Sequence, residues 1–342
     1  MATARVLQAE GRRVVVLEAR DRVGGRLHSV SVGDAGLDLG ATWFWPNEPR
    51  VMSLIDELGL DAHPQYITGD ALYQVPGGVH RMAGNPIDVP SGRLKGGMQS
   101  LAEAMAGSLS EETVRLDHVV TRVRDGGEVL IVEGDFGVME ARHVVVAMPP
   151  GLATHTLEFE PDLPESIRRV AEIVPVWMGA MTKVVVRYER AFWRDGGLAG
   201  AVMSHVGPMR EVHDMSGPSG RPAALFGFAP PLAMGAPTVT EEAVRAQLRE
   251  VFGAEAPEPS EITVFDWRLE PFTTPPGSES RQAYETYGHP AFQTAAMDGR
   301  LHWASTETAR EFPGHIEGAL AAGARVAAAI VTDRPGEGDA GA

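Results

Sequence analysis

The stretch that most constrains the fold lies at residues 13–26, where a β-branched run ends in an acid and a basic, glycine-rich turn follows at once. It reads R-V-V-V-L-E-A-R-D-R-V-G-G-R, with Glu18 at the end of the run and Gly24, Gly25 and Arg26 in the turn. An acid at the tip of the second strand of a Rossmann fold accepts hydrogen bonds from an adenosine ribose. Glycines let the backbone approach a pyrophosphate, and arginine neutralises its charge. The pattern predicts an α/β fold that binds a dinucleotide.

This stretch resembles the FAD-binding entry of the flavin monoamine oxidase family, where V-x-V-L-E-A-R-x-R-x-G-G-R recurs. The resemblance implies a Rossmann-like FAD-binding domain and a second, α+β substrate domain built on a mixed sheet. It implies that Glu18 faces the ribose, that Arg26 faces the pyrophosphate, and that Arg20, Gly24 and Gly25 belong to the cofactor site. The chain contains no cysteine, so a thioether link to the flavin is excluded and FAD would be bound non-covalently.

The residues before this stretch lack a feature that such folds contain. A first strand and a G-x-G-x-x-G turn normally precede the helix that leads into the acidic strand. Here residues 1–11 read as that helix itself, closed by Gly11 just past its end. Because the first strand lies in the middle of the doubly wound sheet, we expect an open slot with unpaired backbone groups. Either the true start lies upstream or the cofactor site is crippled.

Composition and charge limit the kinds of partner that the chain can have. Its 342 residues are enough for two ordinary domains with a sizeable core. The net charge of −16 argues against nucleic acid and anionic membrane surfaces as partners and favours cationic substrates in the long-range field. No apolar run reaches membrane-spanning length, and the N-terminus lacks the pattern of a signal peptide. We therefore expect a cytoplasmic protein with no membrane partner; its oligomeric state stays open, with a homodimer as one option.

Periodicity and turn residues predict the order of elements. Helices are expected over residues 1–11, 49–60, 96–106, 241–252 and 314–331. Strands are expected over residues 71–75, 78–82, 143–148, 181–188 and 262–267, with a meander over 113–116, 119–123, 129–133 and 137–140. The FAD-binding domain is expected to be discontinuous, over residues 1–66, 93–150 and 265–332. The substrate domain is expected over 67–92 and 151–264, and a disordered tail over 333–342.

A second stretch resembles the C-terminal flavin motif of the same family. It reads R-L-H-W-A-S-T-E-T-A from Arg300 and P-G-H-I-E-G-A from Pro313. In the family a strand delivers the first segment and a helix opens in the second, so that its N-terminus faces the flavin carbonyls. The resemblance implies that Glu307 bonds the ribityl or phosphate region and that Gly314, Ile316 and Ala319 lie against the ring.

Further positions match the family in the same order. Lys183, on an apolar strand ahead of a Phe-Trp pair, matches the lysine that holds a water near flavin N5. Trp267 matches the tryptophan beside the isoalloxazine, and Val120 lies where the backbone contacts adenine. The resemblance implies catalytic roles for Lys183, Trp267 and His315. Four residues that follow the pyrophosphate turn complete the implied cofactor site: Gly40, Ala41, Thr42 and Trp43.

Three departures from the family concern the substrate pocket. A helical subdomain is reduced to about residues 66–95, which predicts an open and small pocket. The two tyrosine rings of the amine cage fall on His315 and near Gly277, with Pro276 at an adjacent position, and neither is a tyrosine. Ser305 replaces a glycine. These changes leave the flavin interpretation intact and weaken the amine interpretation.

The predicted activity is the oxidation of a C–N bond of a small, cationic amine, with hydride transfer to flavin N5 and reoxidation by oxygen. An FAD-dependent desaturase or porphyrinogen-type oxidase is the alternative enzyme, and a truncated, non-catalytic relative is the alternative from another class. No H-x-x-x-H or H-x-H pattern occurs, so no metal site is predicted.

Overall fold

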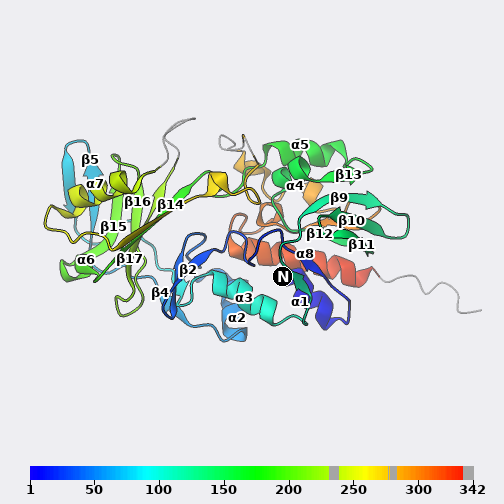
Figure 1. Ribbon diagram of the computed structural model, residues 1–342, viewed down its shortest axis with the longest axis horizontal. Helices are drawn as coiled ribbons and strands as arrows, with labels where there is room; N and C mark the ends of the chain where they lie inside the picture. Colours follow the sequence, from blue (N-terminus) through cyan, green and yellow to red (C-terminus); the bar gives the residue numbers. More distant parts are fainter. Residues whose placement is uncertain (231–238, 276, 278–282, 334–342) are drawn as a thin grey trace, which may run out of the picture.

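The computed structural model describes residues 1–230, 239–275, 277 and 283–333. The molecule is elongated, and its two ends are built on different sheets (Figure 1). One end carries the long yellow-green strands that follow residue 180. The other carries the red C-terminal helix and the short strands that the predicted FAD-binding segments contribute. The expected tail lies outside the described residues from 334 onward.

Two short parallel ladders form the end to which the predicted FAD-binding segments contribute. Strand β1 (Val16–Leu17) pairs in parallel with β8 (Val114–Arg115), and β12 (Val144–Val146) pairs in parallel with β19 (Leu301–Trp303). Within the described residues no ladder joins β1 to β12, and residues of both strands line one cavity. The open slot that the sequence predicts would lie between these two strands.

Two helices cover these ladders. Helix α1 (Ala2–Ala9) packs on α8 (Ile316–Thr332), where the Thr3 hydroxyl donates a 3.0 Å hydrogen bond to the Gly323 carbonyl. A Cβ on Gly323 would lie 2.9 Å from Ala2, so glycine permits this close approach. The packing fixes both helix N-termini beside the cavity described below.

The expected meander is right for three of its four strands. Strands β9 (Val120–Asp125), β10 (Leu130–Gly134) and β11 (Gly137–Ala141) are antiparallel, and β13 (Glu158–Glu160) joins in parallel to β9. The strand expected over residues 113–116 is present as β8, but its place in the meander was wrong, because β8 joins β1. Asp117 has a φ of 56° and donates to the Arg20 carbonyl, so the chain turns between the two sheets. Helices α4 (Pro150–Thr156) and α5 (Glu165–Ile173) cover this layer.

A seven-stranded mixed sheet forms the other end, as predicted. Its order is β18-β14-β17-β16-β15-β5-β6, and only β15 and β5 are parallel. The strands are β5 (Asp70–Val75), β6 (Gly78–Met82), β14 (Thr182–Tyr188), β15 (Leu198–Ser204), β16 (Glu211–Asp214), β17 (Ala223–Ala229) and β18 (Glu261–Asp266). Val184 and Val186 enter the core beneath α7 (Glu241–Phe252), with α6 (Phe192–Asp195) beside them. Lys183 and Val185 face the other side, toward Phe226.

The remaining elements connect the two ends. They are the hairpin β2 (Ser29–Val32) and β3 (Ala35–Asp38), the pair β4 (Ala62–Pro64) and β7 (Gly92–Leu94), and the helices α2 (Pro49–Glu57) and α3 (Gln99–Gly107). The 3₁₀ turns are η1 (Trp267–Leu269), η2 (Tyr284–Thr286), η3 (Pro290–Phe292) and η4 (Thr306–Thr308). Helix α2 buries Val51, Leu54 and Ile55, the apolar face that the sequence predicts. None of the helices in the described ranges is long and apolar enough to cross a membrane.

Candidate functional site

A cavity of about 2130 Å³ runs through the end with the two parallel ladders to the seven-stranded sheet. Every predicted site residue except Glu307 lines it. This cavity holds the predicted FAD region, the region between β1 and β12, and the wall of the large sheet, so the expectation of a small substrate pocket stays a prediction. The segments that the resemblance brought together are therefore neighbours in space.

Glu18 stands at the carboxyl end of β1, on the cavity wall. Its Oε1 accepts a 3.0 Å hydrogen bond from the Arg20 amide, and the Arg20 guanidinium lies 3.2 Å from the same oxygen. Arg20 also contacts Glu270 at 3.3 Å and donates to the Thr273 hydroxyl at 2.8 Å. Arg20 therefore fastens the acidic strand tip to the segment after η1, and Glu18 keeps one oxygen without a side-chain partner in the described structure.

The glycine turn is held by an arginine that the sequence reasoning did not select. Gly24 and Gly25 have φ of 104° and 58°, a region that side chains other than glycine rarely adopt. The Arg22 guanidinium donates to the carbonyls of Val23, Gly25 and Leu27 at 3.0–3.3 Å. Burial and the neighbouring Arg20 lower the pKa of Arg22. The R-x-R spacing of the turn was the available signal.

Glu307 lies behind the cavity wall. Its carboxylate is fully buried and contacts the Arg26 guanidinium at 2.7 Å and 3.1 Å, so Arg26 stands between Glu307 and the cavity. In this arrangement Glu307 would act on a bound cofactor through Arg26, and its direct contact with the cofactor stays a prediction. Gly40 sits directly on the same turn, where a Cβ would lie 1.9 Å from the Arg26 carbonyl.

The residues around the turn fit an FAD pyrophosphate. The Ser305 hydroxyl is buried on the cavity wall and has no hydrogen-bond partner in the described structure, so it is available to a ligand. A Cβ at Gly25 would meet no atom within 4 Å, which leaves its backbone open to approach. The N-termini of α1 and α8 line the same cavity, where a helix dipole favours an anion. Thus the donor set suits a phosphate group.

Lys183 is a buried residue of β14. Its ammonium donates a 2.7 Å hydrogen bond to the Gly40 carbonyl and a second to the Thr42 hydroxyl. It lies 4.3 Å from the centre of the Phe226 ring. Burial lowers the pKa of Lys183 to about 7, with Asp38 opposing the change and Arg93 adding to it. Lys183 therefore lies on the cavity wall and does not reach bulk solvent.

Trp267 follows β18, the strand that pairs with β14 of Lys183. Its backbone amide donates to Met181, and its indole nitrogen donates a 2.9 Å hydrogen bond to the Leu39 carbonyl. The ring packs edge-on against Phe265 at 4.8 Å. Trp267 is thus a rigid apolar wall of the cavity.

His315 caps α8 and contacts a carboxylate that the sequence did not predict. Its Nδ1 lies 2.7 Å from Glu48 Oε1, and its ring packs at 5.0 Å against Trp45. Glu48 precedes α2, with Pro49 at the first helical position, and it is buried. The segment W-F-W-P-N-E-P-R indicates the start of a helix. It contains no signal that Glu48 contacts a residue at the start of α8.

Aromatic rings and one acid also line the cavity. Trp43, Trp177 and Phe228 line it together with Glu211 on β16. The side chain of His213 lowers the pKa of Glu211, so this carboxylate stays charged at neutral pH. The described residue at the predicted second cage position, Gly277, is exposed and does not line the cavity. Pro276 lies outside the described residues.

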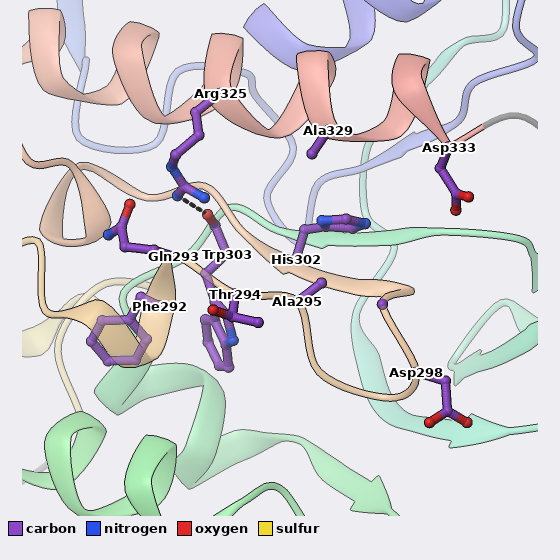
Figure 2. A pocket seen from close by; sticks show the side chains of 11 residues that line it. Phe292, Gln293, Thr294, Ala295, Asp298, His302, Trp303, Arg325, Ala329 and Asp333 are labelled. Atoms are coloured by element: carbon purple, nitrogen blue, oxygen red, sulfur yellow. Dashed lines mark hydrogen bonds between the residues drawn. The ribbon is translucent and has the colours of Figure 1, made fainter.

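A second cavity, of about 350 Å³, lies against the C-terminal half of α8 (Figure 2). Figure 2 shows Arg325 directed at the Trp303 carbonyl, to which it donates a 2.7 Å hydrogen bond, with Gln293 and His302 on either side. None of the predicted site residues lines this cavity. In the described ranges no cluster of three or more His, Cys, Asp or Glu could hold a metal ion.

Comparison with known proteins agrees with this geometry. The profile of the family described as "Flavin containing amine oxidoreductase" matches residues 1–92 and 73–331. Putrescine oxidase from Kocuria rosea is 27% identical, over 97% of this chain and 92% of that protein. Flavin-containing amine oxidase B from Sus scrofa is 25% identical, over 97% and 84%.

Solved structures show the same fold. Wild-type putrescine oxidase bound to putrescine superposes with a TM-score of 0.82 at 24% identity, covering 97% of this chain and 96% of that one. Cyclohexylamine oxidase from Brevibacterium oxydans IH-35A gives 0.82 at 22% identity, covering 97% of each. The chain therefore belongs to the flavin-containing amine oxidoreductase family and is an amine oxidase-like oxidoreductase whose cofactor is FAD.

Proposed function

We propose that this enzyme oxidises the C–N bond of a small amine that carries a second cationic group, and that Glu211 binds that second group. The observation that carries the proposal is the row of facing residues across three strands of the large sheet. Lys183 on β14 faces Phe228 on β17, and Phe228 faces Glu211 on β16. Directly facing residues share one side of a sheet, so all three side chains point to the same side.

This row sets the separation of the charged groups. Neighbouring strands lie about 4.8 Å apart, so the backbones of Lys183 and Glu211 are about 10 Å apart. Phe228 between them supplies an apolar surface for methylene groups. A flexible diammonium ion spans such a distance, whereas a monoamine brings no second cation to the Glu211 carboxylate, whose neighbour is the His213 imidazole at 3.5 Å. The relative named putrescine oxidase supports this substrate class.

The roles of the residues follow from their places on the wall. Bound FAD supplies the acceptor for the hydride equivalent of the substrate carbon and then passes electrons to oxygen. Trp267, Phe228 and Trp43 exclude water from the reacting carbon. Lys183, held by Gly40 and Thr42, is proposed to place a water at the reacting edge. Glu18, Arg26 and the α8 N-terminus are proposed to hold the cofactor, as the resemblance implies.

The proposed substrate domain uses the large sheet. Strands β5 and β6 join the same sheet as β14 to β18. This supports the discontinuous boundaries, with residues 67–92 and 151–264 in the substrate domain and 1–66, 93–150 and 265–332 in the FAD-binding domain.

The experiment is anaerobic reduction of the FAD-loaded protein by a panel of amines, followed by the absorbance of oxidised flavin. Linear diamines should reduce the flavin at lower concentrations than monoamines of equal chain length. Equal concentrations for the two series would overturn the role of Glu211. If no amine reduces the flavin, but a substrate with an oxidisable carbon–carbon bond does, the alternative of a desaturase replaces amine oxidation.

A further inference from the structure

We propose that His315 and Glu48 form a proton-accepting dyad that converts the bound substrate ammonium into the neutral amine. This inference rests on the proposed amine oxidation. It starts from the shortest polar contact of His315, the 2.7 Å approach of Nδ1 to Glu48 Oε1. The two residues are 267 positions apart in the chain, so the fold creates the pair.

The contact fixes the tautomer of the imidazole. An ionised carboxylate only accepts hydrogen bonds, so Nδ1 carries the proton that joins the two groups. The other carboxylate oxygen of Glu48 accepts a 2.9 Å hydrogen bond from the Trp45 amide, so both oxygens are held and the side chain cannot turn away. In the neutral imidazole, Nε2 is then the atom with the free lone pair.

That lone pair is available to a ligand. The His315 side chain is 34% exposed, its residue lines the large cavity, and Nε2 has no partner in the described part of the structure. The ring cannot swing freely, because Trp45 packs against it and Glu48 holds Nδ1, while the Thr306 hydroxyl donates a 2.8 Å hydrogen bond to the His315 backbone carbonyl. The site therefore presents a fixed acceptor to the cavity.

The nearby arginines are paired with other carboxylates, so Glu48 is the charged group that acts on the His315 ring. Arg50, two residues beyond Glu48, contacts Glu317 at 2.9 Å and Glu311 at 3.5 Å, so its charge is balanced by α8 and the preceding turn. Arg26 is paired with Glu307. A cationic substrate therefore meets a dyad with a net charge of −1 while the imidazole is neutral, and this attracts the ammonium.

The proposed step balances without any further reactant. An ammonium nitrogen has no lone pair, and oxidation of its C–N bond needs the neutral amine. The N–H bond of R–CH₂–NH₃⁺ breaks, an N–H bond forms at Nε2 of His315, and the products are R–CH₂–NH₂ and an imidazolium. The Glu48 carboxylate stabilises the imidazolium. The proton leaves to solvent through the cavity after turnover.

The first test observes the tautomer directly. In ¹⁵N-histidine-labelled, FAD-loaded protein, the His315 signals are assigned by their loss in His315→Gln. We expect the Nδ1–H tautomer in the wild type. In Glu48→Gln the amide oxygen can keep the Trp45 bond while its NH₂ donates to Nδ1, so the ring should switch to the Nε2–H form. Glu311→Gln, an equal charge change in the turn before α8, should leave the tautomer unchanged.

The second test measures kcat/KM for the best amine between pH 6 and 10. At pH 7 we expect Glu48→Gln to lower kcat/KM about 100-fold, in the range of one lost proton-transfer group. The loss should shrink as pH rises, because solution then supplies the neutral amine. If wild-type His315 is in the Nε2–H form, the dyad is overturned. An equal loss of kcat/KM at every pH would overturn it as well. Absence of any flavin reduction by amines would overturn the proposed function instead, and the tautomer test would stand apart from it.

Discussion

The Lys183 ammonium donates a 2.7 Å hydrogen bond to the Gly40 carbonyl, and this bond joins the two ends of the molecule. Lys183 lies on β14 of the seven-stranded sheet, while Gly40 rests on the arginine-glycine turn of the proposed FAD site. Trp267 makes a second link between the two ends, because its indole nitrogen donates a hydrogen bond to the Leu39 carbonyl. The residues proposed for the reaction therefore also set how the substrate wall sits against the cofactor turn.

Replacing Lys183 by methionine should slow reoxidation of the reduced flavin by oxygen while FAD stays bound. The lysine acts on the reacting edge through water in the proposed assignment, and it does not hold the cofactor. We expect a decrease of at least tenfold in the bimolecular rate constant, measured by stopped-flow mixing of reduced protein with oxygen. Lys95→Met, at the chain's other lysine, is the matched control. A variant that loses its FAD, or reoxidises at the wild-type rate, contradicts this role.

Lys183 should also make stability depend on pH between 7 and 9. Its pKa is about 7 in the folded protein and about 10.4 in an unfolded chain. In this window the unfolded chain binds a proton that the folded protein does not, so the free energy of unfolding rises with pH. The contribution is at most about 1.4 kcal/mol per pH unit. Urea denaturation at pH 7, 8 and 9 should show a smaller rise in Lys183→Met than in wild type.

The control for this slope is again Lys95→Met. Lys95 is exposed on the surface, and its hydrogen bond to Asp34 raises its pKa, so it stays protonated in both states over this window. Identical slopes in wild type and Lys183→Met would contradict the lowered pKa of the buried lysine.

Local patterns predicted the parts of the fold that local chemistry determines. The acid and glycine turn of residues 13–26, the amphipathic face of α2 and the bounds of α7 follow from propensity, spacing and capping. The mixed sheet followed from the resemblance. Residues 113–116 were misassigned because strand propensity does not say which sheet a strand joins, and a left-handed residue at Asp117 decides that here.

The candidate site was predicted in its positions but not in its contacts. Glu48 and His315 are 267 residues apart, and Lys183 and Gly40 are 143 apart, so no local period links them. The buried Glu307 carboxylate needs a counter-ion and pairs with Arg26, so its expected contact with the cofactor stays a prediction. Only the packed structure shows which of two neighbouring charges faces the cavity.

Glu211→Gln should weaken the preference for diamines. The variant keeps the size of the side chain and removes the charge that meets the second ammonium. We expect kcat/KM for a diamine to fall about 10- to 100-fold, in line with the loss of a charged hydrogen bond, with little change for a monoamine of equal length. Steady-state oxygen consumption measures both. An equal fall for the two substrates would indicate damage to the sheet, and no fall would place the second ammonium elsewhere.

Glu18→Ala should lower FAD retention more than it lowers the stability of the fold. The side chain stands at a strand end with one oxygen available to a ribose, and it contributes little packing. Gel filtration at low FAD concentration, followed by the ratio of flavin to protein absorbance, should show a loss of at least tenfold in affinity. Asp21→Ala, an exposed acid of the same turn, should retain its flavin. Equal retention in both variants would remove Glu18 from the cofactor site.

Supplying a strand for the slot between β1 and β12 should raise both flavin content and thermal stability. Val16 and Val144 lie in separate ladders whose residues line the same cavity, and no ladder joins the two strands in the described residues. A chain extended at its N-terminus by a β-branched strand and a G-x-G-x-x-G turn can fill this slot in parallel and bring backbone amides to the pyrophosphate. The control extension has the same length and composition, with two prolines in the strand segment, because proline cannot donate to a ladder. A higher ratio of bound FAD and a Tm increase of several degrees are expected only for the first extension. If both extensions act alike, the gain comes from the added length, and the slot does not accept a strand.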